Sequence, residues 1–115
     1  MASAVKQATT SSTPDKRVTL WTLTDADPTG DYLELPAGPD RSVQIIFSAG
    51  TGTVAIEGTN EPTPTTTSTL HNAVDGTSLS TTIPLFAQVL EVSLKIRPTL
   101  TGGSGATVLV YLCSN

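Results

Sequence analysis

The residues best suited to catalysis are few in this chain, and their types do not combine into a catalytic group. His71 is the only histidine and Cys113 is the only cysteine. Nucleophilic catalysis needs a base beside a Ser, Thr or Cys nucleophile, and the sequence contains no GxSxG elbow that would present one. Zinc needs three or four His, Cys or carboxylate ligands. The sequence therefore predicts no enzyme, with no catalytic residues, no cofactor and no zinc site.

The turn fragment DADPTGD places oxygen atoms at the spacing of a calcium-binding loop. Asp25, Asp27 and Thr29 stand at the first, third and fifth ligand positions, and Gly30 stands at the turn glycine. The twelfth position, which carries a bidentate glutamate in such loops, is Pro36. We therefore predict no metal ligands and favour a turn whose aspartates bond the backbone of the turn itself, with calcium binding as the alternative.

Carbohydrate chemistry is the third class of site that these residues could support. Glu34, Glu57 and Glu91 lie in strand-like stretches and are expected to face solvent, whereas glycoside hydrolysis needs two carboxyl groups that face one cleft. Sugar binding usually needs exposed aromatic platforms, and most of the aromatic residues here fall within strand patterns that favour burial. Because β-sandwiches often host sugar sites, a carbohydrate-binding module remains an alternative.

The elements that must position these residues are strands. Apolar and polar residues alternate, no segment has helical period, and Pro or Gly recurs about every ten residues. The clearest strand-like segments are residues 17–23, 32–35, 42–49, 53–58 and 106–113. This pattern predicts an all-β fold, an antiparallel β-sandwich that is jelly-roll-like or immunoglobulin-like, with about seven to eight strands.

Two glycine-rich fragments are expected to reverse the chain. GTG at residues 50–52 predicts a hairpin within residues 42–58, and TGGSG at residues 101–105 predicts a second hairpin within residues 94–112. Pro98 is expected at a strand end or on an edge strand, because proline cannot donate to a sheet ladder.

Charge and composition divide the chain into an arm and a body. Residues 1–16 are small and polar and predict a flexible or extended N-terminal arm, and residues 17–115 predict a single β-sandwich domain. Lys6, Lys16 and Arg17 are the candidate contacts of this arm with an acidic partner surface, and a short solvated tail is the alternative.

The body of the chain is acidic and weakly charged for its size. Between residues 18 and 92, nine carboxylates are opposed by Arg41 alone, which predicts no binding to nucleic acid. The longest apolar run, residues 83–90, is far shorter than the roughly 20 residues that a membrane helix needs, so no membrane partner is predicted. Charged residues make up only 14% of the chain. Either a partner covers part of the surface, or Thr, Ser and Gly replace charge as polar residues.

The Pro/Thr tract after residue 58 is the candidate partner-contact loop. Its prolines prevent the preceding strand from continuing in the sheet, and the segment that follows is long for a loop. A short strand near residues 69–72 is one prediction for it, and a surface excursion is the other. The candidate contact residues are Asn60, Glu61, His71 and Asn72.

Three fragments, in this order and spacing, resemble the small structural proteins of tailed bacteriophages. LWTLTDADPTGDYLELPAGPDRSVQI (residues 20–45) resembles their Trp-containing strand, D-x-G-x-x-x-E-L-P turn and D-R/K-S-V-Q strand entry. GTVAIEGTNE (residues 52–61) is similar to their G-x-V-x-I-x-G-S-N-D strand and turn. IRPTLTGGSGATVLVYL (residues 96–112) is similar to their closing hairpin. After Asn60 this chain departs from the family, which continues with a glycine and a second Trp-containing strand.

The resemblance implies a component of the virion: a non-enzymatic capsid decoration (cement) protein that binds the outer capsid surface and stabilises the assembled head. It implies the major capsid protein as partner and the capsid surface as location, after synthesis in the host cytoplasm. A head–tail or tail-associated structural protein is an alternative, as is the carbohydrate-binding module. Self-association as a dimer or trimer is also expected, because closed symmetric contacts would bury apolar surface.

Overall fold

The computed structural model describes residues 8–13, 16–34 and 41–114 of the chain. Within these ranges the chain forms eight strands and no helix, and every strand pairing is antiparallel. No described segment is therefore a helix that could cross a membrane. The strands are β1 (Ala8–Thr13), β2 (Lys16–Thr24), β3 (Leu33–Glu34), β4 (Arg41–Thr59), β5 (Ser68–Thr69), β6 (Ser80–Thr81), β7 (Leu85–Gln88) and β8 (Lys95–Ser114).

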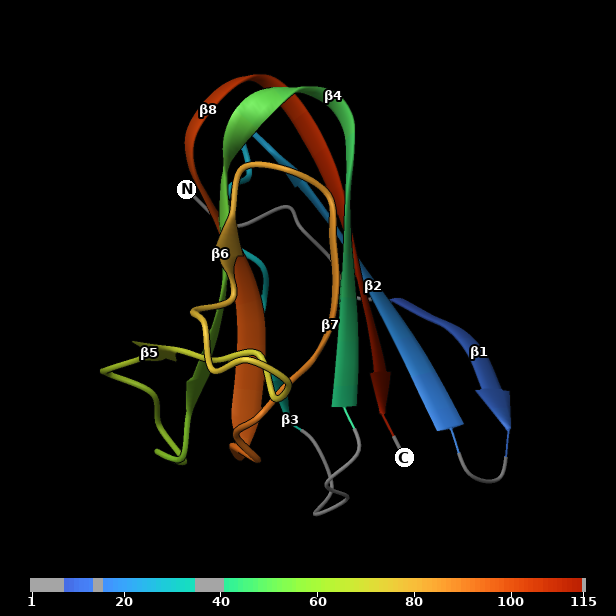
Figure 1. The fold of residues 1–115 in the computed structure, drawn as a ribbon, viewed down its shortest axis with the longest axis vertical. Coiled ribbons are helices and arrows are strands. Elements are labelled where there is room, and N and C mark those ends of the chain that lie inside the picture. The colour runs from blue at the N-terminus through green and yellow to red at the C-terminus, as the bar shows by residue number, and fades with distance from the viewer. Residues whose placement is uncertain (1–7, 14–15, 35–40, 115) are drawn as a thin grey trace.

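Two long strands, β4 and β8, organise the whole fold. They have 19 and 20 residues and pair with each other along their lengths, beginning with Arg41 opposite Ser114. Their register shifts between Phe47 and Thr53, where the two strands arch over together at the top of Figure 1. Each strand therefore contributes one half to each of two layers.

The two halves of this bent pair carry the layers of a sandwich. The first layer has the order β1, β2, β8, β4, β7 and uses residues 41–47 of β4 and 107–114 of β8. In the second layer, residues 53–59 of β4 pair with residues 95–101 of β8. There β3 extends the β8 side, and β5 and β6 extend the β4 side. The predicted all-β antiparallel sandwich of seven to eight strands is confirmed.

Both predicted hairpins are wrong, because each glycine-rich fragment lies inside one continuous strand. GTG bends β4 and TGGSG bends β8, and the two bends pair with each other. Gly50 has φ +69 and approaches the other bend so closely that a Cβ built on it would lie 2.3 Å from the carbonyl oxygen of Gly105. A hairpin and a bent strand both need glycine at positive φ, so the local sequence does not distinguish them.

Pro98 also departs from its predicted place, since it lies within β8, opposite Ile56 of β4. Its carbonyl oxygen accepts a hydrogen bond from the backbone N–H of Gly30 at 2.9 Å, and Gly30 lies in the loop that precedes β3. In an antiparallel strand, the N–H and C=O of one residue point to the same side. The missing N–H of Pro98 therefore faces a loop rather than β4, and the β4–β8 ladder stays intact.

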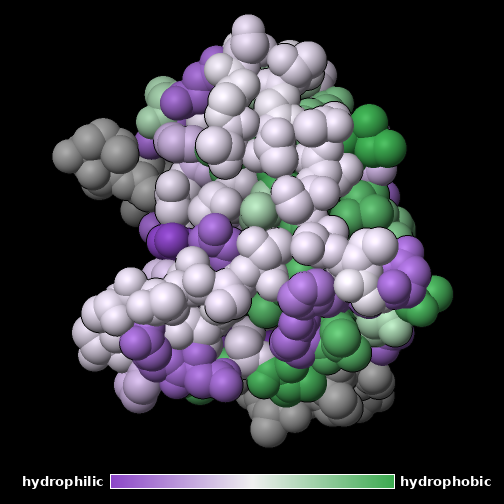
Figure 2. All heavy atoms as spheres, turned by 60° about the vertical axis from the view of Figure 1, so that its left-hand side comes forward, coloured by the Kyte–Doolittle hydropathy of each residue, from purple (hydrophilic) through white to green (hydrophobic). Residues whose placement is uncertain are grey.

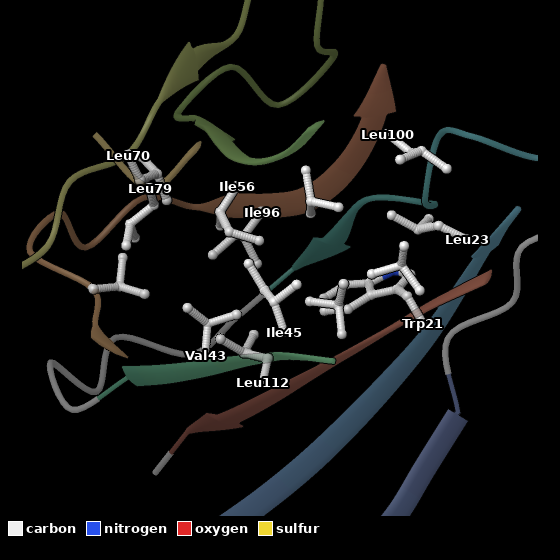
Figure 3. Packing of buried hydrophobic residues seen from close by; sticks show 14 of the residues in the cluster. Trp21, Leu23, Val43, Ile45, Ile56, Leu70, Leu79, Ile96, Leu100 and Leu112 are labelled. Atoms are coloured by element: carbon white, nitrogen blue, oxygen red, sulfur yellow. The ribbon is translucent and has the colours of Figure 1, made fainter. Parts of the chain in front are cut away.

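The core lies between the two layers, and its side chains point toward one another from both (Figure 3). Trp21 is 1% exposed, and its Nε1–H donates to the carbonyl oxygen of Asp31 at 3.0 Å. The buried hydrophobic residues are Trp21, Leu23, Leu33, Val43, Ile45, Val54, Ile56, Leu70, Leu79, Ala87, Val89, Ile96, Leu100, Ala106, Val108, Val110 and Leu112. Four of them, Leu70, Leu79, Ala87 and Val89, come from the segment between β4 and β8. That segment therefore closes one side of the sandwich.

The described part of the predicted N-terminal arm is a strand. Residues 8–13 form β1, which pairs with β2 at the edge of the first layer (Figure 1). Lys16 opens β2 opposite Thr13, and Arg17 pairs with Ser114 of β8. Lys6 lies outside the described residues.

Candidate partner-binding surface

The Pro/Thr loop after β4 is built around the carboxylate of Glu61. This carboxylate accepts hydrogen bonds from the backbone N–H groups of Thr65 at 2.9 Å and Thr66 at 2.8 Å, and from the Thr65 hydroxyl at 3.0 Å. The backbone N–H of Glu61 donates in turn to the hydroxyl oxygen of Thr59. The hydrogen bonds from Thr65 and then Thr66 hold the pKa of the Glu61 carboxyl below its ordinary value. The Glu61 carboxylate therefore holds the backbone of this loop in place through hydrogen bonds.

Asn60 attaches the same loop to the start of β8. Its Oδ1 accepts a hydrogen bond from the backbone N–H of Leu94 at 2.8 Å. Next to it, Nζ of Lys95 donates to the carbonyl oxygen of Pro62 at 2.9 Å. These contacts join residues more than thirty positions apart, so a tract rich in proline and threonine keeps a defined shape on the surface.

His71 is paired with Glu91. The two carboxylate oxygens of Glu91 contact the backbone N–H of His71 at 2.8 Å and its ring Nδ1 at 2.5 Å. Burial tends to raise the pKa of the Glu91 carboxyl, but the hydrogen bonds from the ring and the amide of His71 outweigh it and leave this pKa lowered. The pair links the strand-like residues after β5 to the connection between β7 and β8.

Asn72 shapes a tight turn that ends in an exposed apolar side chain. Its Oδ1 accepts from the backbone N–H of Val74, and its carbonyl oxygen accepts from the backbone N–H of Gly76, both at 2.8 Å. The carboxylate of Asp75 accepts from the backbone N–H and the hydroxyl of Thr77. The turn holds Val74 out from the surface, with 85% of that side chain exposed.

The structure brings together only some of the four predicted contact residues. Asn60 and Glu61 line one groove of about 360 Å³, and Glu91, the partner of His71, lines it too. Asn72 lines a different groove. The predicted short strand near residues 69–72 is confirmed in part, since β5 ends at residue 69 and residues 71 and 72 form isolated bridges. Contact of these residues with a partner stays a prediction.

Sequence reasoning missed a set of exposed apolar side chains in the segment that follows. This exposed apolar set consists of Val74, Ile83, Phe86, Leu90 and Val92, whose exposed fractions run from 47% to 85%. In Figure 2, apolar atoms gather along one side of the molecule, with polar groups between them. The apolar run at residues 83–90 is the feature of the sequence that could have indicated these side chains. Its alternation is imperfect, and the four-residue strand β7 accounts for only part of it.

The candidate calcium loop uses its first aspartate for a structural purpose. Both oxygens of the Asp25 carboxylate accept backbone hydrogen bonds from the bend of β8, from Gly105 at 2.7 Å and Ala106 at 3.1 Å. The backbone N–H of Asp27 donates to the hydroxyl oxygen of Thr24. Across the described residues, no three His, Cys, Asp or Glu side chains come together as a metal site. The favoured prediction, an aspartate that bonds the backbone of its own turn, is wrong for Asp25, because its carboxylate bonds the backbone of β8 instead.

The outer side of the second layer carries an ion pair that also covers an aromatic ring. The Arg97 guanidinium lies 3.3 Å from Oε1 of Glu57 and 4.5 Å from the centre of the Tyr32 ring. The guanidinium of Arg97 therefore covers the ring of Tyr32 and also pairs with the carboxylate of Glu57. This arrangement does not offer the open aromatic platform that sugar binding usually needs.

Comparison with solved structures finds the same fold in a prophage protein. The crystal structure of the SPBc2 prophage-derived protein YomS aligns with a TM-score of 0.60 and 14% sequence identity, over 91% of this chain and 99% of that one. A cupin domain from Bordetella pertussis Tohama I aligns with a TM-score of 0.41 and 14% identity, over 96% and 93% of the two chains. The likeness to YomS shows a shared fold, and the cupin alignment is too loose to support an argument.

No protein-family model matches the sequence, and no curated protein matches it.

Proposed function

We propose that the protein is a non-enzymatic structural protein of a bacteriophage virion, which binds the outer surface of the capsid and stabilises the assembled head. Its partner in this proposal is the major capsid protein. The observation that carries the proposal is the exposed apolar set between residues 74 and 92. Apolar groups held in water on a fixed surface favour association with a partner that covers them.

The segment that bears these side chains is held in place by the rest of the domain. The His71–Glu91 pair lies within it, the carboxylate of Glu61 folds the loop before it, and Asn60 ties that loop to β8. A surface that is ordered before binding loses less conformational freedom when a partner covers it. The ionisable groups of this region thus serve the shape of a binding surface, which supports binding rather than catalysis.

The likeness in fold to a prophage-derived protein supports the phage origin of this proposal. So do the three sequence fragments that resemble structural proteins of tailed phages. Many copies of the protein would occupy equivalent positions on a symmetric capsid. Multivalent contact then lets a modest apolar surface on each copy contribute to the stability of the whole particle.

The proposal is tested by mixing the purified full-length protein with purified capsids that lack their decoration protein. We expect the protein to sediment with the capsids and to raise the temperature at which they disrupt. Protein that stays in the supernatant at high molar excess over capsid would contradict the proposal. The position of the bound protein in an electron micrograph reconstruction separates a capsid-surface role from a tail-associated one.

A matched pair of variants tests the exposed apolar set itself. The triple variant Val74→Ser, Ile83→Ser, Leu90→Ser is expected to fold normally, because all three side chains are more than half exposed. It should weaken capsid binding at least about tenfold, since truncating apolar interface residues removes most of the favourable contact. The control, Thr101→Ala with Ser104→Ala, truncates exposed polar side chains at the bend of β8 and should bind like the unaltered protein.

A further inference from the structure

The outer side of the first layer is apolar where an exposed sheet face is usually polar. Residues 41–46 of β4 and 106–114 of β8 alternate between the core and the outside, so Val110 and Ile45 are buried whereas Tyr111 and Ile46 face outward. We call this surface the uncharged face. Its apolar residues are Val18, Leu20, Ile46, Phe86, Leu109 and Tyr111.

Strand register places these residues side by side. Residues paired directly across an antiparallel sheet project from the same side. Tyr111 pairs with Leu20 on one side and Gln44 on the other, and Gln44 pairs with Phe86 of β7. In the next row, Leu109 pairs with Ile46. The apolar groups therefore form one continuous surface across four strands.

This face carries no outward charge in the part of the chain whose side chains the structure describes. Between residues 18–24, 41–47, 85–88 and 107–114, the one ionic residue is Arg41. Its side chain is 2% exposed and donates to the carbonyl oxygen of Ser93. The outer side of the second layer differs, because it bears the Glu57–Arg97 ion pair. The two faces of the sandwich are thus suited to different surroundings.

The uncharged face is also hollowed beside its most exposed side chain. A groove of about 420 Å³ is lined by Val18, Ile46 and Tyr111 among others, and Phe86 forms one wall of it. Phe86 lies on β7 at the sheet margin and is 70% exposed. A projecting apolar ring next to an apolar groove is self-complementary, since a two-fold axis places each ring in the groove of the other copy.

Charge also favours a second copy as the occupant. The chain has a formal net charge of −4, so two copies repel each other over most orientations. Contact through the uncharged face brings no described carboxylate against another. Such a contact also buries no described charge. A charged partner, by contrast, would lose the hydration of its charges against a face that offers no opposite charge.

We propose that the uncharged face binds a second copy of this chain about a two-fold axis, with Phe86 of each copy in the groove of the other. Four strands about 4.8 Å apart, with three outward positions each, span roughly 20 by 20 Å. This is below the roughly 800 Å² per partner of a standard interface, so the dimer is expected to be weak and to form only at high protein concentration. The dimer does not depend on capsid binding.

Sedimentation velocity of the full-length protein, from low to several hundred micromolar, tests the proposal. The sedimentation coefficient should rise with concentration from that of a monomer to that of a dimer. Phe86→Ser should weaken the dimer roughly thirtyfold, as loss of a central aromatic contact does. Because Phe86 is 70% exposed, this variant is expected to keep its fold, which its melting temperature checks.

Lysine substitutions on the two faces supply the matched control. Ile46→Lys places a charge on the uncharged face and should abolish the dimer, whereas Ala55→Lys places the same charge on the same strand in the other layer and should leave it intact. A protein that stays monomeric at every concentration overturns the proposal, as does a trimer. So does a dimer that tolerates Phe86→Ser and Ile46→Lys. Phe86 also belongs to the exposed apolar set, so Ile46→Lys, at a residue outside that set, is the variant that tests the dimer without changing the proposed capsid contacts. The Val74, Ile83 and Leu90 variant tests capsid binding separately.

Discussion

A side chain added at Gly50 tests the bend that joins the two layers, and one added at Gly102 is its matched control. Both glycines have positive φ, +69 and +63, so alanine at either position adopts the left-handed region. A Cβ at Gly50 would lie 2.3 Å from the carbonyl oxygen of Gly105, whereas a Cβ at Gly102 would meet nothing within 4 Å. Only Gly50→Ala therefore forces the paired backbones of β4 and β8 apart.

The two substitutions share one cost and one gain. The left-handed conformation costs alanine about 1–2 kcal/mol, and the more restricted unfolded chain returns about 0.4–1 kcal/mol. Gly102→Ala should therefore lower the free energy of unfolding by about 1 kcal/mol. Forcing an overfilled site to shift adds about 1–3 kcal/mol at Gly50, so Gly50→Ala should lower it by about 3 kcal/mol.

Urea unfolding, followed by the fluorescence of Trp21, measures both losses. Trp21 is the only tryptophan and is 1% exposed, so its emission reports the loss of the core. The reasoning requires the Gly50 variant to be the less stable of the two by roughly 2 kcal/mol. Equal losses would refute it, because they would mean that the close approach of the two bends contributes nothing beyond backbone strain.

Two further predictions concern the Pro/Thr loop and the N-terminus. Because the pKa of Glu61 is lower in the folded loop than its ordinary value of about 4.5, the loop is stabilised above that pH and loses this stabilisation as the pH falls through the lowered pKa. NMR shifts of the Thr65 and Thr66 amides should follow this titration and be insensitive to it in Glu61→Gln, and unchanged shifts in the unaltered protein would exclude the role of Glu61. Deleting residues 1–13 removes β1 from the edge of the first layer, and should leave the sandwich folded while weakening capsid binding. A truncated protein that binds capsids as well as the full chain would exclude residues 1–13 as a contact and leave Lys16 and Arg17 as the candidates.

Alternation of side chains made the sandwich predictable, whereas pairing over long distances did not. The pattern at residues 17–23 predicted β2, and it placed Trp21 in the core. The same pattern gave the right strands on both sides of GTG and TGGSG but the wrong partners. Period-two alternation reports which side of a strand is buried and says nothing of which strand lies beside it. The pairing of β4 with β8 is set by the packing of the whole domain.

The candidate surface was predictable in its location and not in its residues. The Pro/Thr tract after Asn60 indicated that the chain leaves the regular strands there. The predicted contact residues were the polar ones, Asn60, Glu61, His71 and Asn72. Their hydrogen bonds hold the segment together. The exposed apolar residues lie further on, within an apolar run that resembles an ordinary buried strand. Exposure is a property of the folded neighbourhood, and composition alone does not report it.

The passage of β8 through both layers has a consequence for the synthesis of the protein. β8 is the last of the described strands, and it pairs with β2, β3 and β4. Neither layer can therefore form on the ribosome until residues 95–114 have emerged. We expect both layers to be completed only after these residues have emerged and, because the main pairings join distant segments, we expect the domain to fold slowly for its size. A chain that ended before residue 95 would lack β8 and could complete neither layer. Such incomplete chains would therefore not compete with finished ones for their partner.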